Sequence, residues 1–217
     1  MKPYDSVVNQ SERRPVDPKP VIGLLGAPGA GKSSIAGIFA RLGCGVIDSD
    51  RLAQELLDTP EVCEQLAQWW GPGMLAPDGR VDRKAVASVV FVDADKRERL
   101  EGLIHPQVHQ KRVLLRQAFQ ADNTCLAIVE DCPLILEAGL QDTFDVLVYI
   151  DVPTEVRQQR VAAIRGWSVR ELHLREENQA PLDIKRSSAD YILDNGADLG
   201  AVEAQVRRVL QQILDPK

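Results

Sequence analysis

Short apolar segments separated by amphipathic stretches make up most of this chain. Residues 21–25, Val-Ile-Gly-Leu-Leu, form a nearly continuous apolar run, as expected of a parallel strand that is buried on both faces. Similar short runs predict strands at residues 45–48, 126–130, 146–150 and 191–193. Because helical stretches separate these segments, the pattern predicts an α/β fold with a doubly wound parallel sheet.

Two amphipathic helices are predicted to cover this sheet. The first, residues 32–42, has an apolar face made of Ile35, Ile38, Phe39 and Leu42. Gly43 stands where a residue with left-handed backbone would end that helix. The second, residues 199–214, turns five apolar residues toward the sheet: Val202, Val206, Val209, Leu210 and Ile213.

The predicted core is interrupted by two insertions. It comprises residues 20–50, 124–152 and 182–217, and the longer insertion, residues 51–123, is mostly helical with a Pro/Gly-rich break near residues 71–79. Such a segment is too long for a simple crossover and predicts an inserted helical subdomain. The shorter insertion, residues 153–181, is more charged. Residues 1–19 are polar, lack periodicity and are expected to form a flexible leader.

Composition narrows the possible partners. A chain of 217 residues with 44% hydrophobic and 27% charged residues fits one globular α/β domain with an insertion. The net charge of -6, from 26 basic and 32 acidic residues, argues against nucleic acid or an anionic membrane as the main partner. Neither a membrane-spanning run nor an apolar signal region is found, so a cytoplasmic location is expected. The sequence carries no signal for an oligomeric state.

The cysteines give no sign of metal binding. All 4 are widely spaced, without a C-x-x-C pair and without a histidine at zinc-finger distance. Cys44 and Cys125 lie in or beside apolar segments, which is typical of reduced, buried thiols.

A glycine-rich motif follows the first predicted strand and opens the first predicted helix. Residues 26–33, Gly-Ala-Pro-Gly-Ala-Gly-Lys-Ser, satisfy G-x-x-x-x-G-K-[ST], a match that arises by chance in roughly one in a hundred chains of this length. In this position the backbone N–H groups can converge on phosphate oxygens at the positive end of a helix. We therefore expect a P-loop that binds the phosphates of ATP through Gly26, Ala27, Pro28, Gly29, Ala30, Gly31, Lys32, Ser33 and Ser34.

Two side chains of this loop have separate expected roles. Lys32 brings a positive charge to the β- and γ-phosphates and acts on the transferring phosphoryl group. The hydroxyl of Ser33 is expected to ligate the Mg²⁺ that bridges these phosphates.

Acidic residues end each of the other predicted strands. They are Asp48 and Asp50, Glu130 and Asp131, Asp151, and Asp194. The carboxyl ends of parallel strands meet at one edge of a sheet, so carboxylates are expected around the γ-phosphate, where they deprotonate a substrate hydroxyl or hold Mg²⁺ through water. An aspartate after a strand is also a common helix N-cap. We favour a functional role for Asp50 and a capping role for Asp151 and Asp194, and the two interpretations are evenly balanced for Asp48.

Several short strings, taken in order, resemble the motifs of the dephospho-CoA kinases over about residues 20–210. Besides the phosphate loop they are Asp48-Ser49-Asp50, Leu103-Ile104-His105-Pro106, Pro133-Leu134-Ile135-Leu136-Glu137, Gln179-Ala180-Pro181 with Lys185, and residues 189–195. Each string is weak alone, but their order and spacing are distinctive. The resemblance implies a P-loop NTPase fold with a three-layer α/β/α core, in which residues 51–123 receive the acceptor substrate and residues 153–181 form a lid over ATP.

The resemblance also implies an activity. Enzymes of this family use ATP to phosphorylate the 3′-hydroxyl of the dephospho-CoA ribose, the last step of coenzyme A synthesis. Asp50 matches the second carboxylate of the family's DxD motif, which acts as a base or orients the acceptor hydroxyl. His105, Pro133 and Leu134 fall at substrate-binding positions, and Asn195 falls in a loop that approaches the adenine of ATP. From the residues alone, His105 before Pro106 predicts a turn and fits a structural role equally well.

The expected lid departs from the family pattern at one arginine. Arg160, Arg175 and Gln179 stand at family positions, but the usual second arginine, four residues after Arg160, is replaced by Ile164 and followed by Arg165. Arg160 and Arg165 are expected to neutralise the transferring phosphoryl group. For any single lid arginine, a solvated helix face is the commoner role.

Two alternatives share the fold and the phosphate loop. One is another P-loop kinase, acting on nucleoside monophosphates or a small metabolite, which the strings at His105-Pro106 and residues 179–195 oppose. The other is a nucleotide-gated switch of the GTPase kind. Against the switch stand the absence of an Asn-Lys-x-Asp string and the arginine-bearing second insertion.

Overall fold

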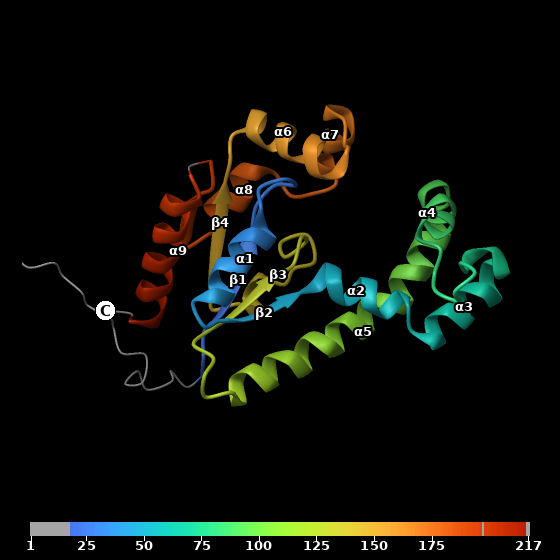
Figure 1. Ribbon diagram of the computed structural model, residues 1–217, viewed down its shortest axis with the longest axis horizontal. Helices are drawn as coiled ribbons and strands as arrows, with labels where there is room; N and C mark the ends of the chain where they lie inside the picture. Colours follow the sequence, from blue (N-terminus) through green and yellow to red (C-terminus); the bar gives the residue numbers. More distant parts are fainter. Residues whose placement is uncertain (1–17, 197, 216–217) are drawn as a thin grey trace, which may run out of the picture.

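Five parallel strands form the centre of the protein in the computed structural model (Figure 1). The structure describes residues 18–196 and 198–215. In the sheet the strands follow the order β2-β3-β1-β4-β5, and all neighbouring pairs are parallel. Their bounds are β1 (Val21–Leu25), β2 (Gly45–Asp48), β3 (Ile128–Asp131), β4 (Val146–Asp151) and β5 (Tyr191–Asp194). This confirms the doubly wound parallel sheet that the sequence predicts.

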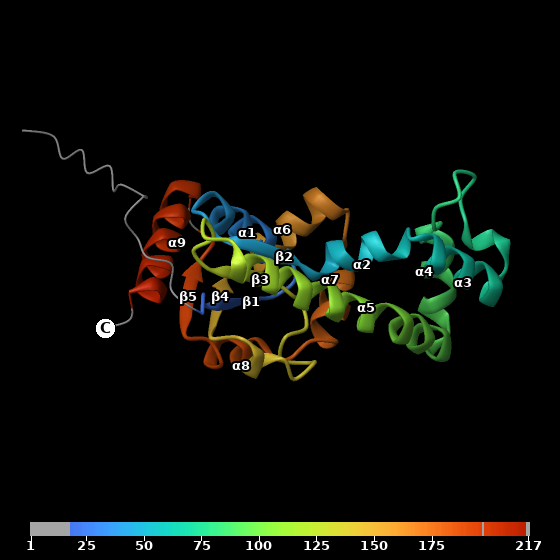
Figure 2. The same ribbon diagram turned by 90° about the horizontal axis from the view of Figure 1, so that it is seen from below.

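Helices lie on both sides of the sheet, which gives the three-layer α/β/α core. Figure 2 shows α1 and α8 on opposite sides of the strands. The helices are α1 (Lys32–Arg41), α2 (Ser49–Leu57), α3 (Pro60–Trp70), α4 (Arg83–Val92), α5 (Ala94–Ala121), α6 (Thr154–Arg165), α7 (Val169–Glu177), α8 (Leu182–Ser187) and α9 (Leu199–Leu214), with short 3₁₀ turns η2 (Pro72–Met74) and η3 (Gln141–Thr143).

Helices α1 and α9 cover one face of the sheet and enclose its main apolar core. Ile22 and Leu24 of β1 belong to this core together with Phe39 of α1. The residues of the last helix that were predicted to face the sheet are all buried: Val202, Val206, Val209, Leu210 and Ile213. Helix α1 ends as predicted at Gly43, whose φ is 96° and whose amide donates to the Ala40 carbonyl at 3.0 Å.

Helix α5 and the turn after β3 cover the opposite face. Val21 and Ile128 are buried there, and Phe119 of α5 packs against them. The approach of α5 to the sheet is close, because a Cβ added to Gly45 of β2 would lie 2.5 Å from the Phe119 ring. Glycine at this position therefore lets the helix lie directly on the strand.

Helices α3 and α4, with the adjoining ends of α2 and α5, form an arm that extends away from the sheet (Figure 1). A separate apolar cluster fills this arm and includes Leu56, Val62, Leu66, Val86 and Ile104. The arm lies within the predicted helical insertion, residues 51–123, although α2 already begins at Ser49. It has a core of its own, distinct from the core of the sheet.

The turn predicted at His105-Pro106 is wrong, because Pro106 lies inside the continuous helix α5. Proline disfavours helical backbone in the preceding residue and removes one backbone hydrogen bond. Here packing on both sides of the proline outweighs that cost: Ile104 is buried in the arm cluster, and Val108 packs against both that cluster and the cluster under the sheet. His105 is consequently an exposed side chain on a helix.

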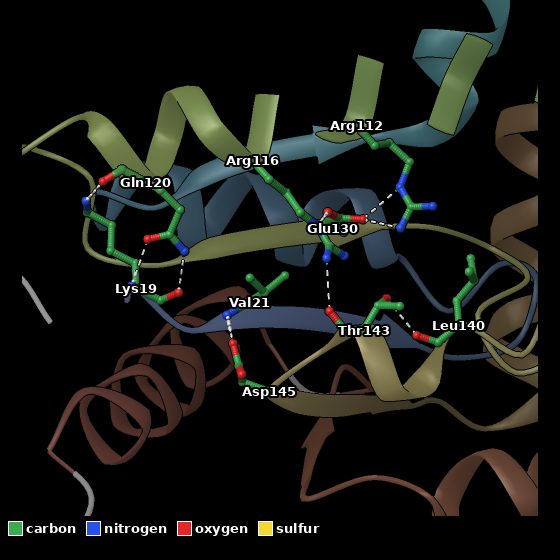
Figure 3. A network of polar contacts seen from close by, with 9 residues as sticks. All are labelled: Lys19, Val21, Arg112, Arg116, Gln120, Glu130, Leu140, Thr143 and Asp145. Atoms are coloured by element: carbon green, nitrogen blue, oxygen red, sulfur yellow. Dashed lines mark hydrogen bonds and ion pairs between the residues drawn. The ribbon is translucent and has the colours of Figure 1, made fainter. Parts of the chain in front are cut away.

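Two arginines of α5 hold this helix onto β3 (Figure 3). The Nε and Nη2 atoms of Arg112 donate to Oε2 of Glu130 at 2.9 and 2.6 Å, and Arg116 pairs with the other oxygen. Glu130 is fully buried, and Arg112 is only 7% exposed. Arg116 also donates to the Thr143 carbonyl at 2.9 Å. Breaking such a buried pair leaves an uncompensated charge, so the contact fixes the long helix of the arm to the sheet.

The packed structure begins slightly before the boundary predicted for the leader. Lys19 is buried, its amide donates to Gln120 Oε1 at 2.9 Å, and Gln120 Nε2 donates back to the Lys19 carbonyl at 2.7 Å. Residues 1–17 of the predicted leader lie outside the described residues. In the part of the chain that the structure covers, no helix is long and apolar enough to cross a membrane.

The cysteines are all buried free thiols: Cys44, Cys63, Cys125 and Cys132. This confirms the expectation for Cys44 and Cys125. Burial raises the pKa of Cys44 to about 12, so this thiol is protonated and unreactive near neutral pH.

Candidate active site

The glycine-rich loop between β1 and α1 has the backbone that its sequence requires. Gly29 and Gly31 have φ values of 80° and 84°, in the left-handed region that favours glycine. Space is also limiting, because a Cβ on Gly29 would lie 2.7 Å from Val161 and one on Gly31 would lie 2.6 Å from the Asn195 side chain. The loop is therefore tightly held between α6 and the residues after β5.

The side chain of Lys32 folds back onto this loop. Its ammonium group donates to the Gly26 carbonyl at 3.1 Å. Burial lowers the pKa of Lys32; Asp131 and Asp50 oppose that shift, whereas Lys185 and Arg165 add to it. The positive charge of Lys32 thus lies among two carboxylates and two further cations, although these residues come from distant parts of the chain.

Ser33 and Asp131 are in direct contact. The Ser33 hydroxyl donates to Oδ2 of Asp131 at 2.6 Å. Asp131 is buried at the end of β3, and burial raises its pKa, while the Ser33 hydrogen bond and Lys32 act in the opposite direction. The sequence grouped Asp131 with the strand-end carboxylates, and the structure distinguishes it by this contact with the phosphate loop.

Asp48 and Asp50 have different local roles. Asp48 is the N-cap of α2 and accepts the Arg51 amide at 2.9 Å. Asp50 lies in the first turn of α2 and is exposed to solvent. Partial burial of its carboxylate raises its pKa, and the like charges of Asp131 and Asp48 add to this rise. Lys32 and Arg165 oppose this rise. Asp50 is thus an accessible carboxylate beside the lysine and the buried aspartate.

Three other strand-end carboxylates do not join this group. Glu130 was expected near the phosphates but points to the opposite face, toward Arg112, because successive side chains of a strand alternate between faces. The capping role predicted for Asp151 and Asp194 is also wrong. Asp151 pairs with Arg186, and Asp194 accepts the Gly196 amide at 2.8 Å in a turn. The N-caps of α6 and α9 are Pro153 and Asp198.

Asn195 supports the phosphate loop. Its side-chain amide donates to the Ala30 carbonyl at 2.7 Å and is buried. Arg160, which projects from α6, donates to the Asn195 carbonyl at 2.7 Å. Arg160 and Asn195, both predicted site residues, are therefore in contact with each other beside the loop.

Helices α6 and α7 lie over the phosphate loop (Figure 1), and buried cations hold α6, α7 and the following helix α8 in place. Arg157 is 2% exposed and joins α6 to α7 through Glu176. Lys185 of α8 is 1% exposed, pairs with Glu137 at 3.0 Å and donates to Gln179 at 2.8 Å. In sequence Lys185 is identified only as part of a family string and Arg157 is not identified, because both cations resemble the surface-exposed lysines and arginines of any helix.

Three residues that were predicted to bind the acceptor substrate lie outside the phosphate loop, on α5 and in the turn after β3. Pro133 is half-buried and Leu134 is exposed in the turn that follows β3. His105 is exposed on α5.

Ser34, which was predicted to bind phosphate, is exposed in the first turn of α1.

The resulting site combines phosphate-binding backbone with hard oxygen donors. Ser33 and Asp131 offer a hydroxyl and a carboxylate, the ligand types that Mg²⁺ prefers when it also binds substrate phosphates. Among the residues described, no group of three or more His, Cys, Asp or Glu side chains is arranged as a complete metal site. The donors therefore fit an ion shared with a nucleotide rather than a site formed by the protein alone.

A model of the family described as Dephospho-CoA kinase matches residues 20–200 of the chain. The chain is 35% identical over 195 residues to a dephospho-CoA kinase of Thermobifida fusca, covering 88% of this chain and 95% of that protein. It is also 35% identical over 198 residues to a dephospho-CoA kinase of Moorella thermoacetica, covering 89% of this chain and 92% of the relative.

Solved structures show the same fold. The structure of TT1252 from Thermus thermophilus superposes with a TM-score of 0.76 at 28% identity, covering 94% of this chain and all of that one (100%). A dephospho-CoA kinase from Campylobacter jejuni superposes with a TM-score of 0.67 at 23% identity, covering 89% of this chain and 96% of that one.

Proposed function

Because the chain belongs to the dephospho-CoA kinase family, we propose that its phosphate loop and the carboxylates beside it transfer the γ-phosphoryl group of ATP to the 3′-hydroxyl of dephospho-CoA. The enzyme is an ATP-dependent kinase of coenzyme A synthesis. The observation that carries the assignment of residues is the convergence of Lys32, Asp50 and the Ser33–Asp131 pair at one edge of the sheet.

In the proposed reaction, Asp50 accepts or orients the proton of the acceptor hydroxyl. The hydroxyl oxygen then forms a bond to the γ-phosphorus as the bond between that phosphorus and the β,γ-bridging oxygen breaks, releasing ADP. A carboxylate whose pKa is raised is a better base than an ordinary aspartate. Asp50 is accessible to solvent, so an acceptor that enters the site can reach it.

Lys32 and the loop amides bind the phosphates of ATP. The Lys32 ammonium group donates a hydrogen bond to the Gly26 carbonyl, which belongs to the same loop. The N–H groups of this loop would bind the β-phosphate. The charge of Lys32 stabilises the transferring group as negative charge accumulates on the leaving oxygen. Ser33 and Asp131 would hold Mg²⁺, directly or through water, and the ion would neutralise the bridged β- and γ-phosphates.

The segment above the loop, residues 153–181, is proposed as the lid. Arg160 and Arg165 would face the phosphates, and Arg160 already contacts the Asn195 carbonyl beside the loop. Asn195 is proposed to support nucleotide binding through the loop that its amide holds. The arm and the turn after β3, with His105, Pro133 and Leu134, are proposed to receive dephospho-CoA. The cytoplasmic location expected from the sequence stays a prediction.

A coupled assay of ADP release tests this function. The acceptors compared are dephospho-CoA, a set of nucleoside monophosphates and shikimate, with an acceptor-free sample as the baseline. We expect strong selection of dephospho-CoA and a product that co-migrates with coenzyme A. Comparable turnover of a nucleoside monophosphate would favour the other kinase interpretation, and acceptor-independent ADP release as the only activity would favour the nucleotide switch.

A further inference from the structure

Trp167 is an aromatic residue of the lid with two arginines on its ring. The guanidinium carbon of Arg165 lies 4.8 Å from the ring centroid, and that of Arg175 lies 4.0 Å from it. Both distances are within the range of a cation–π contact. The two arginines come from different helices, since Arg165 ends α6 and Arg175 lies in the last turn of α7.

The position of Trp167 is fixed by the ends of both helices. Gly166 ends α6 with a left-handed φ of 66°, and the Trp167 amide donates back to the Val161 carbonyl at 3.3 Å. Ser168 is the N-cap of α7 and forms a capping box with Glu171. The Ser168 side chain accepts a hydrogen bond from the Glu171 backbone amide, and the Glu171 carboxylate accepts one from the Ser168 backbone amide. Trp167 is therefore the middle residue of a three-residue connection, residues 166–168, between two capped helices, which fixes the position of its backbone.

Neither arginine on the ring forms an ion pair in the described part of the chain, although Arg175 adds to the lowering of the pKa of Glu171 that the Ser168 hydrogen bonds cause. Across residues 18–196 and 198–215, the ion pairs of the protein include neither Arg165 nor Arg175. By contrast, Arg157 of the same segment is buried and paired with Glu176. Arg157 thus serves the packing of the lid, whereas Arg165 and Arg175 make no ion pair within the described residues and contact the Trp167 ring instead.

The charge of Arg165 reaches the phosphate site. It opposes the rise in the pKa of both Asp50 and Asp131 and adds to the lowering of the pKa of Lys32. Ile164, the residue before Arg165, is 80% exposed and carries no charge. Arg165 is therefore the cation at this end of α6 whose charge acts on Asp50, Asp131 and Lys32.

We propose that Trp167 is the positioning residue of the lid: its ring holds Arg165, together with Arg175, in the direction of the transferring phosphoryl group. A free arginine side chain has many rotamers, and contact with a flat ring that is itself fixed reduces them before the nucleotide binds. The aromatic face also offsets the repulsion between two guanidinium groups that are near each other. This inference rests on the proposed contact between Arg165 and the phosphates.

The test is a double-mutant cycle on kcat and on KM for ATP, measured with the full-length enzyme at saturating dephospho-CoA. A cation–π contact at an accessible site changes an equilibrium by about two- to fivefold. Trp167→Leu should therefore lower kcat by about two- to fivefold, whereas Trp167→Phe, which keeps an aromatic face, should lower kcat by less than about twofold. In an Arg165→Ala background, Trp167→Leu should add less than about a twofold further loss.

Arg170→Ala is the matched control, because Arg170 is an exposed arginine of α7 that is not on the ring, and its kcat should not change. Equal losses from Trp167→Leu with and without Arg165, or no loss from it at all, would overturn the proposal. Equal losses in the Leu and Phe variants, with the far-UV circular dichroism unchanged, would do the same.

If Arg165→Ala keeps full kcat, the phosphate role of Arg165 and this inference both fail, while selection of dephospho-CoA in the acceptor assay would still stand.

Discussion

The Ser33 hydroxyl donates a hydrogen bond of 2.6 Å to the carboxylate of Asp131. This contact joins the first turn of α1, where the phosphate loop ends, to the carboxyl end of β3. The contact places a hydroxyl and a carboxylate next to each other. These two groups would hold the proposed Mg²⁺ of the bound nucleotide.

Replacing Asp131 with Asn should therefore weaken the use of Mg²⁺. Loss of a group that orients or ligates a metal commonly costs about 10- to 100-fold in affinity or activity. We expect a fall in kcat of this size and a rise in the Mg²⁺ concentration needed for half-maximal rate, measured in a magnesium titration at saturating substrates. Asp142→Asn, at an exposed residue of η3, is the control and should titrate as the wild type. An unchanged magnesium titration for Asp131→Asn would exclude Asp131 from the metal site.

Lys32→Ala should lower kcat by orders of magnitude and leave the fold intact. The charge acts on the leaving oxygen during transfer. In the structure without nucleotide, the Lys32 ammonium mainly contacts the Gly26 carbonyl, and burial lowers its pKa, so the folded protein gains little from the charge. Steady-state kinetics and thermal unfolding measure the two effects. Full activity would exclude the phosphate-loop assignment, and a collapse in melting temperature would make Lys32 a structural residue.

Glu130→Gln should destabilise the protein strongly although it does not touch the proposed reaction. The substitution leaves Arg112 buried without its counter-charge, which typically costs about 3–5 kcal/mol. The free energy of unfolding from urea titration measures this. Glu203→Gln, which removes two exposed ion pairs, with Arg41 and with Arg207, should change the stability by about 1 kcal/mol or less. Similar effects of the two variants would show that the Arg112–Glu130 pair does not fix α5.

The raised pKa of Asp50 has a consequence for stability. A folded-state pKa above the ordinary aspartate value, about 3.9, means that the folded protein binds this proton more tightly than the unfolded chain does. Ionised Asp50 therefore opposes folding above its folded pKa, and the effect disappears below the unfolded value. Asp50→Asn should unfold at a higher temperature than the wild type at pH 7, with a difference that shrinks as the pH approaches 4. A lower melting temperature at pH 7 would mean that Asp50 stabilises the fold.

Much of the fold and of the phosphate-binding site could be predicted from local sequence. The strands are short and mostly apolar, and the phosphate loop combines a motif with its position between strand and helix, so both signals are found within a few residues. The helix α9 is predicted to the residue, because its five buried positions follow one helical period.

The predictions were wrong or incomplete where contacts with residues distant in sequence determine the direction, burial or backbone conformation of a residue. Both faces of a parallel strand are buried, so nothing in the pattern of β3 shows that Glu130 faces α5 while Asp131 faces Ser33. Likewise the buried state of Lys185 depends on Glu137, which lies on another element. The helix through Pro106 is a third case, since packing on either side of it outweighs a local preference.

The most direct test of the proposed chemistry is kcat of Asp50→Asn at saturating ATP and dephospho-CoA. General-base assistance contributes about 10²- to 10⁴-fold, so we expect kcat to fall by that factor while the affinity for ATP changes little, because the phosphate loop lies on another strand. Asp194→Asn is the matched control: because an amide oxygen can still accept the Gly196 hydrogen bond, kcat should stay within about threefold of the wild type, and the stability should change by about 0.5 kcal/mol or less. An Asp50→Asn enzyme with nearly normal kcat would contradict the role of Asp50 and leave Asp48 or Asp131 as the base.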